Sequence, residues 1–111
     1  MELIEYDDFA KLDIAVVKVI SAEKLEGSKN LLKLTVNTGD SERVIVSGIS
    51  NSYTPEDIIG KKIVMLLNLK PKKIFNIESN GMILAAESDG NISLLTCDRE
   101  LPEGSKIRWG D

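Results

Sequence analysis

The sequence predicts an all-β fold, an OB-type five-stranded barrel with a short helix between its third and fourth strands. Segments in which apolar and polar residues alternate recur along the chain, with turn residues between them. A strong helix start, Thr54-Pro55-Glu56-Asp57, follows the third such segment, which is the layout of an OB barrel. An SH3-like barrel or a small sandwich would carry similar strands. The length of 111 residues suits one core, so we expect residues 1–111 to form a single domain.

The first half of the chain predicts a short helix and three strands. Asp7 is placed to cap the helix, which ends near Leu12. The strands are expected at residues 12–20, 32–37 and 43–49. The clearest alternation is in the second, where Leu32, Leu34 and Val36 face one side, which indicates a half-buried strand.

The second half predicts the helix of the barrel and then further strands. Thr54 caps this helix, Pro55 suits its first position, and Gly60 ends it after about two turns. Strands are expected at residues 62–67, 82–87 and 92–95, with a last short strand at residues 106–109. A long loop is expected over residues 68–80, and a hairpin turn at residues 88–91.

Histidine is absent and cysteine occurs once, which excludes most catalytic and metal-binding sites. No Ser-His or Cys-His pair can form, and the usual zinc ligand sets are missing. An enzyme built on carboxylates and lysines remains conceivable, but the acidic pairs Asp7-Asp8 and Glu56-Asp57 are better explained as helix starts. We therefore expect a non-catalytic protein with no cofactor and no metal.

Three features of the sequence argue for a cytoplasmic protein that does not enter a membrane. The longest apolar run, residues 63–67, has five residues, far fewer than a membrane span needs. The N-terminus is acidic, whereas a secretory signal begins with positive charge. A single cysteine also cannot form an internal disulfide, as is usual in the cytosol.

The charge is unevenly distributed along the chain. The formal net charge is −4, which by itself argues mildly against nucleic-acid binding. Residues 60–80, however, contain five lysines and one acid, whereas residues 1–13 contain five acids and one lysine. The distribution therefore leaves room for one anion-binding surface on an acidic protein.

The loop after the fourth strand is the best candidate for that surface. Lys70, Lys72 and Lys73 flank Pro71, which stiffens the backbone and lowers the entropy lost on binding. Three cations on a stiff loop suit backbone phosphates, although a solvated face is the simpler alternative. Phe75 could stack on an unpaired base, but its isoleucine neighbours favour packing in the core.

Four runs of residues form a specific pattern: VSGI at 46–49, YTPEDIIGKK at 53–62, NLKPKK at 68–73 and SNGMILAA at 79–86. This pattern resembles the tRNA-binding domain family. That family includes the C-terminal domain of bacterial methionyl-tRNA synthetases, archaeal β-subunits of that enzyme, synthetase-associated cytokine precursors and free-standing tRNA-binding proteins. The resemblance covers nearly the whole chain.

The resemblance implies an OB fold that binds the body of tRNA by shape. The length is most like that of the free-standing members, which act as homodimers. The resemblance also suggests methionyl-tRNA synthetase as a partner. The implied tRNA-binding residues are Lys29, Asn30, Lys33, Asn68, Lys70, Lys72, Lys73, Ser79 and Met82.

Several positions depart from the family pattern. An arginine and a glycine near the start are Ala15 and Val17 here, and a lysine before the second strand is Asn30, with Lys29 beside it. The glycine of the loop is Asn76, which tolerates the left-handed backbone conformation.

A protein–protein module is the alternative function, because some members of the family resemble export chaperones. The acidic N-terminus and the sequence pI of about 4.9 fit that alternative. An exposed barrel edge with Leu94, Leu95 and Trp109 nearby would give a homodimer a physical cause.

Overall fold

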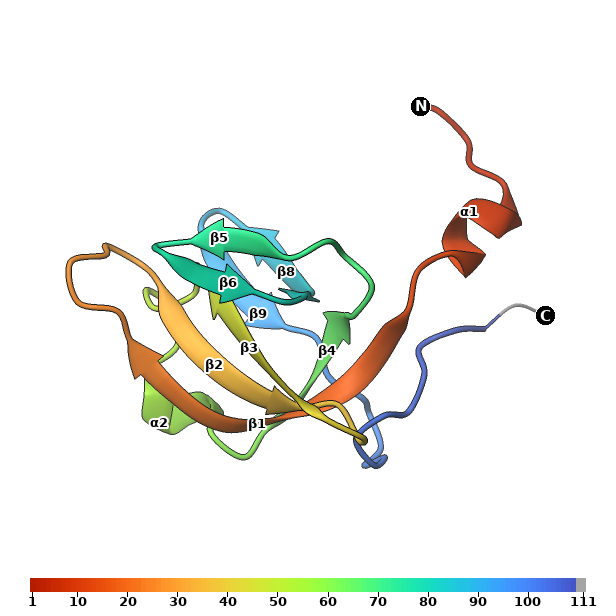
Figure 1. Cartoon of the computed structure of the whole chain (residues 1–111). Helices are drawn as coiled ribbons and strands as arrows, with labels where there is room; N and C mark the ends of the chain where they lie inside the picture. The colour runs from red at the N-terminus through yellow and green to blue at the C-terminus, as the bar shows by residue number, and fades with distance from the viewer. Residues whose placement is uncertain (110–111) are drawn as a thin grey trace.

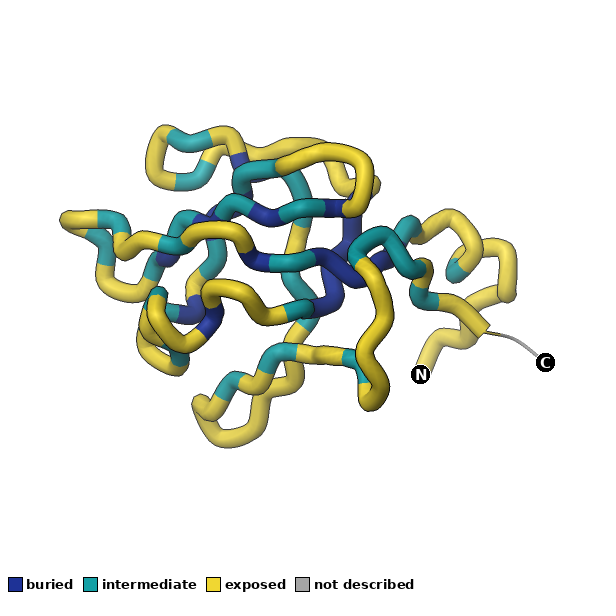
Figure 2. Tube along the Cα trace, turned by 90° about the horizontal axis from the view of Figure 1, so that it is seen from below, coloured by how far each residue is buried: buried dark blue, intermediate teal, exposed yellow. Residues whose placement is uncertain are grey.

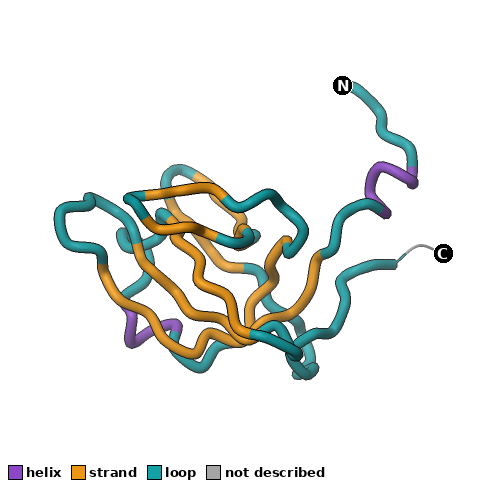
Figure 3. Tube along the Cα trace, viewed as in Figure 1, coloured by secondary structure: helices purple, strands orange, loops and turns teal. Residues whose placement is uncertain are grey.

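The regular structure is almost entirely β-strand (Figures 1 and 3). The computed structural model describes residues 1–109. Its elements are α1 (Tyr6–Ala10), β1 (Ile14–Lys24), β2 (Leu32–Asn37), β3 (Glu42–Ser47), α2 (Pro55–Ile58), β4 (Lys62–Leu66), β5 (Lys72–Ile74), β6 (Ile77–Ser79), β7 (Met82–Ile83), β8 (Ala85–Ser88) and β9 (Asn91–Leu94).

Five strands form one curled antiparallel sheet in the order β3-β2-β1-β4-β7. β1 is the central strand: Val19 pairs with Val36 of β2, and Val17 pairs with Ile63 of β4. The sheet curls until the free edge of β3 meets the chain between β6 and β7, where the Asn80 N–H donates to the Val44 carbonyl at 2.9 Å. The curled sheet and the helix after β3 confirm the predicted OB-like all-β class.

The core fills the inside of this half-barrel, as the dark segments of Figure 2 indicate. Leu34, Ile45 and Met65 are at most 1% exposed and lie in one cluster. A second, smaller cluster of Ile14, Val64 and Leu66 covers the opposite face of β1 and β4. Both faces of β4 and of the first part of β1 are therefore buried, which is why residues 14–17 and 63–67 are continuous apolar runs.

The single turn of α2 closes one end of the barrel. Thr54 is its N-cap, as predicted: the Thr54 hydroxyl accepts from the Asp57 N–H, and the Asp57 carboxylate accepts from the Thr54 N–H. Ile58 is 0% exposed and packs into the main cluster. The helix has one turn and not the expected two, because the backbone is already extended at Ile59.

Three further predictions of secondary structure are wrong. The cap of α1 is Glu5, not Asp7. β1 runs on to Lys24, because after an irregularity between Val19 and Ser21 it pairs along β2, where exposure removes the apolar pattern. Residues 106–109 form only an isolated bridge, between Lys106 and Ala15.

The strand expected at residues 82–87 is split in two at Leu84. The Leu84 N–H donates to the Val64 carbonyl at 3.0 Å, and its own carbonyl accepts from the Leu95 N–H at 3.2 Å. The chain thus changes partners at this residue, leaving the main sheet to pair with β9. The turn predicted at residues 88–91 is present, with Asp89 and Gly90 at positive φ.

Candidate nucleic-acid interface

The predicted long loop contains a hairpin, β5–β6, which stands on the open side of the sheet (Figure 1). Lys72 pairs with Ser79, Lys73 with Glu78, and the two isoleucines 74 and 77 close the ladder. The turn residues Phe75 and Asn76 have φ values of 53° and 68°, the arrangement of a two-residue hairpin loop. The left-handed conformation expected at Asn76 is therefore confirmed.

Ser79 joins this hairpin to the barrel. It is 4% exposed, and its Oγ accepts a hydrogen bond from the Val46 N–H of β3 at 2.9 Å. Because β3 is an edge strand, that N–H would otherwise lack a partner in the structure. The Ser79 side chain thus fixes the position of the hairpin, and it does not present its hydroxyl on the surface.

Gly81 explains the spacing between Ser79 and Met82. A Cβ at this position would lie 2.7 Å from Cε of Met65, and the φ of 131° also disfavours a side chain. The backbone therefore lies close against the core at this point, which lets Met82 of β7 pair with Leu66 of β4. The Met82 side chain remains 45% exposed.

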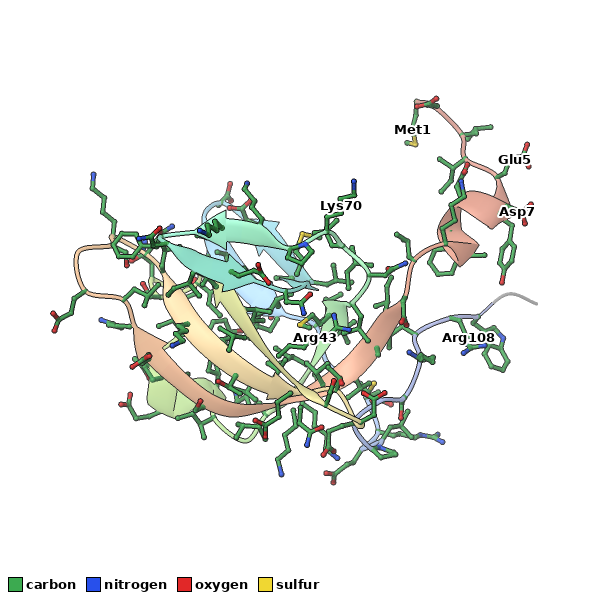
Figure 4. All side chains as sticks on the ribbon, viewed as in Figure 1. Met1, Glu5, Asp7, Arg43, Lys70 and Arg108 are labelled. Atoms are coloured by element: carbon green, nitrogen blue, oxygen red, sulfur yellow. The ribbon has the colours of Figure 1, made fainter. Side chains whose placement is uncertain are left out.

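The three lysines around Pro71 are exposed and have no ionic partner among residues 1–109. Lys70 points away from the barrel on the loop that leads into β5 (Figure 4). Four lysines elsewhere, at positions 11, 33, 62 and 106, do form ion pairs: Lys62 lies 3.2 Å from Glu100 and 3.4 Å from Glu103. Glu100 is the main cause of a raised pKa at Lys62. The free positive charge of this part of the molecule is thus concentrated at Lys70, Lys72 and Lys73.

The β1–β2 loop lies beside the tip of the hairpin and adds Lys29 and Asn30. Cζ of Phe75 is 3.5 Å from the point that a Cβ on Gly27 would occupy, so the two loops are in contact. Lys29 is exposed, and the side chain of Asn30 packs against Gly48. Lys33 follows on β2, where it forms an ion pair with Glu23 at 3.7 Å.

Asn68 has both polar atoms of its side chain engaged within the protein. Its Oδ1 accepts from the Asp13 N–H at 2.8 Å, and its Nδ2 donates to the Lys11 carbonyl at 2.7 Å. The amide therefore holds the start of β1 against the end of β4. The role of Asn68 in this structure is to anchor the N-terminal segment at the root of the lysine loop.

The sequence did not predict the contact of one residue in this region, and it predicted the wrong environment for another. Arg43 donates from Nη1 to the Leu67 carbonyl at 2.6 Å, which fixes the chain just before the loop (Figure 4). Its position in an alternating strand gave no signal of that contact. Phe75, expected in the core, is 50% exposed, because the two isoleucines that flank the turn face inward and the ring does not.

The other end of the molecule carries a different surface. The first twelve residues project from the barrel, and Leu3, Ile4 and Tyr6 are more than 60% exposed. A hollow of about 390 Å³ separates α1 from the C-terminal segment, and its walls include Phe9, Leu12 and Ile107. Trp109 is 84% exposed nearby, whereas Leu94 is half-buried. These apolar groups form what we call the terminal surface: Leu3, Ile4, Tyr6, Phe9, Leu12, Ile107 and Trp109.

Residues 1–109 contain no cluster of three side chains suited to hold a metal ion. No helix within these residues is long and apolar enough to cross a membrane.

Residues 14–106 match the family model described as "Putative tRNA binding domain". The methionine–tRNA ligase of Methanococcus aeolicus is 51% identical over 107 residues, which are 96% of this chain and 16% of that protein. That of Archaeoglobus fulgidus is also 51% identical, over 106 residues and with the same coverage. The chain thus spans 16% of the length of these curated relatives.

Solved structures give the same relationship. A MetRS-related protein from Pyrococcus horikoshii superposes with a TM-score of 0.92 at 41% identity, covering 97% of this chain and 100% of that one. The chaperone CsaA from Bacillus anthracis superposes with a TM-score of 0.87 at 29% identity, covering 96% and 100%.

Proposed function

Because this chain belongs to the tRNA-binding domain family, we propose that it is a non-catalytic protein that binds the body of tRNA by shape. The observation that supports this most is the set of unpaired lysines, Lys70, Lys72 and Lys73, on a loop fixed by Pro71, Ser79 and Arg43. A fixed loop presents its cations with little further loss of entropy. Such cations neutralise backbone phosphates, which dominate affinity for RNA.

In this proposal Lys29, Lys33 and Met82 extend the surface on either side of the lysine loop. Lys29 and Lys33 come from the β1–β2 loop and β2, and Met82 from β7. Asn30, Asn68 and Ser79 support these residues from within, by packing or by hydrogen bonds. Of the nine residues of the family pattern, six would therefore contact RNA and three would hold those six in place. We place this activity in the cytoplasm.

A salt titration tests the proposal. If the surface neutralises about four to six phosphates, log K for bulk tRNA falls with log salt at a slope of roughly −3 to −5. The affinity for tRNA should exceed that for single-stranded DNA and for a plain RNA duplex of the same length, because shape sets the selectivity. A flat salt dependence, or equal affinity for all three, contradicts the proposal.

We further propose that the protein is a homodimer joined through the terminal surface. Leu3, Ile4 and Tyr6 are exposed apolar side chains on an arm that the barrel does not cover. Burial of each such side chain against a second copy is worth about 1.5–3 kcal/mol. Sedimentation at micromolar concentration should give twice the mass of 12.2 kDa, and a monomer would contradict the dimer.

The relatives also motivate a partner in trans. In the two ligases described above the similar region is a small part of a longer enzyme. We propose that this chain can supply the same region to a methionyl-tRNA synthetase that lacks it. The test is aminoacylation by such an enzyme with and without this chain: the KM for tRNA should fall and kcat should stay constant.

A chaperone-like protein-binding role is the second candidate. The observation that favours it is the superposition with the chaperone CsaA, together with the apolar terminal surface. Suppression of the aggregation of an unfolded client protein would support it. Loss of that suppression with tRNA present would indicate that both ligands use the lysine loop.

A further inference from the structure

Phe75 has an unusual place among the five aromatic residues of the chain. Tyr6 and Phe9 lie against each other with ring centroids 6.2 Å apart, and Tyr53 packs against the main core cluster. Trp109 belongs to the terminal surface. Phe75 alone among the aromatic residues lies on the lysine-bearing hairpin, at its turn, with half of its side chain exposed.

The backbone at Phe75 is strained as well as exposed. Its φ of 53° lies in the left-handed region, where a bulky side chain is an outlier. Asn76 beside it, at 68°, is a residue type that suits this conformation. Asparagine or glycine at position 75 would form the same turn with less strain. Strained residues of this kind gather at functional sites, where the surrounding structure holds them.

The ring does not obtain compensation from core packing. The ring faces Gly27 of the adjoining loop, which has no side chain and leaves the ring with a bare backbone on that side. Phe75 is absent from both core clusters of the described residues, whereas Ile74 and Ile77 are half-buried. The exposed part of the ring therefore remains available to a ligand.

Two lysines lie close to this residue, one in its own hairpin and one in the loop that the ring contacts. Lys73 precedes it by two residues on β5, and Lys29 follows Gly27 by two residues on the adjoining loop. An exposed aromatic ring with lysines close by is an arrangement that binds unpaired nucleotides, because the base stacks on the ring and the neighbouring phosphates meet the lysines.

We propose that Phe75 stacks on an unpaired base of the bound RNA, with Lys29 and Lys73 holding the flanking phosphates. This rests on the proposed function and adds to it a contact that a fully paired duplex cannot make. The strained turn keeps the ring turned outward, so that stacking needs no rearrangement of the hairpin.

Phe75→Asn and Phe75→Trp test the proposal together. Asparagine keeps the turn and removes the ring, so tRNA affinity should fall about 5- to 100-fold with the salt slope unchanged. Affinity for a blunt RNA duplex should stay the same. Tryptophan should retain the affinity, and tRNA should quench its fluorescence beyond any quenching in the parent protein, which reports Trp109 alone.

The outcomes separate this inference from the function on which it rests. Equal tRNA affinity of the parent and of a folded Phe75→Asn variant overturns the stacking alone, as does an equal loss of affinity for tRNA and duplex. Failure of the parent protein to bind tRNA overturns both. The thermal midpoint of Phe75→Asn, expected at or above that of the parent, shows that any loss is not a failure to fold.

Discussion

The β5–β6 hairpin and the N-terminal arm both project from the barrel, but they expose opposite kinds of surface. The hairpin exposes lysines without ionic partners and is held by hydrogen bonds to β3. The arm exposes leucine, isoleucine and tyrosine beside carboxylates, and Asn68 holds its root. Unpaired cations suit a polyanion, whereas exposed apolar groups suit a protein surface. One small barrel can thus present two interfaces that do not compete for a ligand.

The largest effect should come from reversing charge on the hairpin. Lys70→Glu together with Lys73→Glu should lower tRNA affinity by about 100-fold or more, because two attractive phosphate contacts become repulsive. Both side chains are exposed, so the thermal midpoint should hardly change. Filter binding at constant salt measures the effect.

Lys61→Glu is the matched control for that experiment, because Lys61 is also exposed but lies beside α2. It should leave tRNA affinity within about threefold of the parent value. An equal loss from the control would mean that net charge decides binding and that the hairpin is not special.

Substitutions in the N-terminal arm should weaken self-association. Leu3→Ser together with Ile4→Ser removes two exposed apolar side chains and should raise the dimer dissociation constant about tenfold or more. Sedimentation across a concentration series measures it. The intrinsic tRNA affinity of each protomer should be unchanged, and a parallel loss of tRNA binding would show that the two regions are not independent.

Ser79→Ala tests whether this serine supports the hairpin or contacts the RNA. The variant leaves the buried Val46 N–H without its acceptor, so unfolding free energy should fall by about 1–3 kcal/mol. Urea denaturation measures the loss. Unchanged stability with weakened tRNA binding would instead assign the hydroxyl to the RNA contact.

Asn68→Ala tests the junction between the two regions. Loss of its two hydrogen bonds should cost about 1–2 kcal/mol of stability and should weaken self-association more than tRNA binding. Asn68→Asp, which keeps an acceptor for the Asp13 N–H, should lose about half as much. Weakened tRNA binding at parental stability would make Asn68 a direct contact.

The smallest expected effect is a loss of folding stability in acid, and it should involve neither the β5–β6 hairpin nor the N-terminal arm. The Thr38 hydroxyl lowers the pKa of Asp40, and the Thr54 N–H lowers that of Asp57. Groups with lowered pKa values stabilise the fold above their unfolded pKa, and that stability is lost as pH falls through the folded pKa, below the ordinary value of 3.8.

Thermal melts should therefore be flat from about pH 5 to pH 8 and decline below about pH 4. Asp57→Asn should remove part of that decline, since its carboxylate caps α2. A transition near neutral pH would contradict this account, because the chain has no histidine.

The fold class was predictable because its main signals are local. The alternation of Leu32, Leu34 and Val36 and the helix start at Thr54 each arise within a few residues. The β5–β6 hairpin was missed because its strands have three residues each and its turn, Phe75-Asn76, is not one of the common turn pairs.

The lysine loop could be found from the sequence, but the contacts that hold it in place could not. The free lysines follow from the local sequence around Pro71. The burial of Ser79, in contrast, depends on Val46, 33 residues away, and the two bonds of Asn68 reach back 55 and 57 residues. Only the closed barrel brings those partners together. Neither periodicity nor a family motif could therefore distinguish the residues that support the loop from those proposed to contact RNA.

The contact between the hairpin and β3 also protects the protein against aggregation through the edge of its sheet. β3 ends the main sheet, and a bare strand edge there would offer its N–H and C=O groups to any other extended chain. Ser79 and Asn80 occupy that edge at Val46 and Val44. A substitution that releases the hairpin should therefore promote aggregation by strand addition. The same segment that we assign to RNA binding would then also be what keeps the barrel soluble.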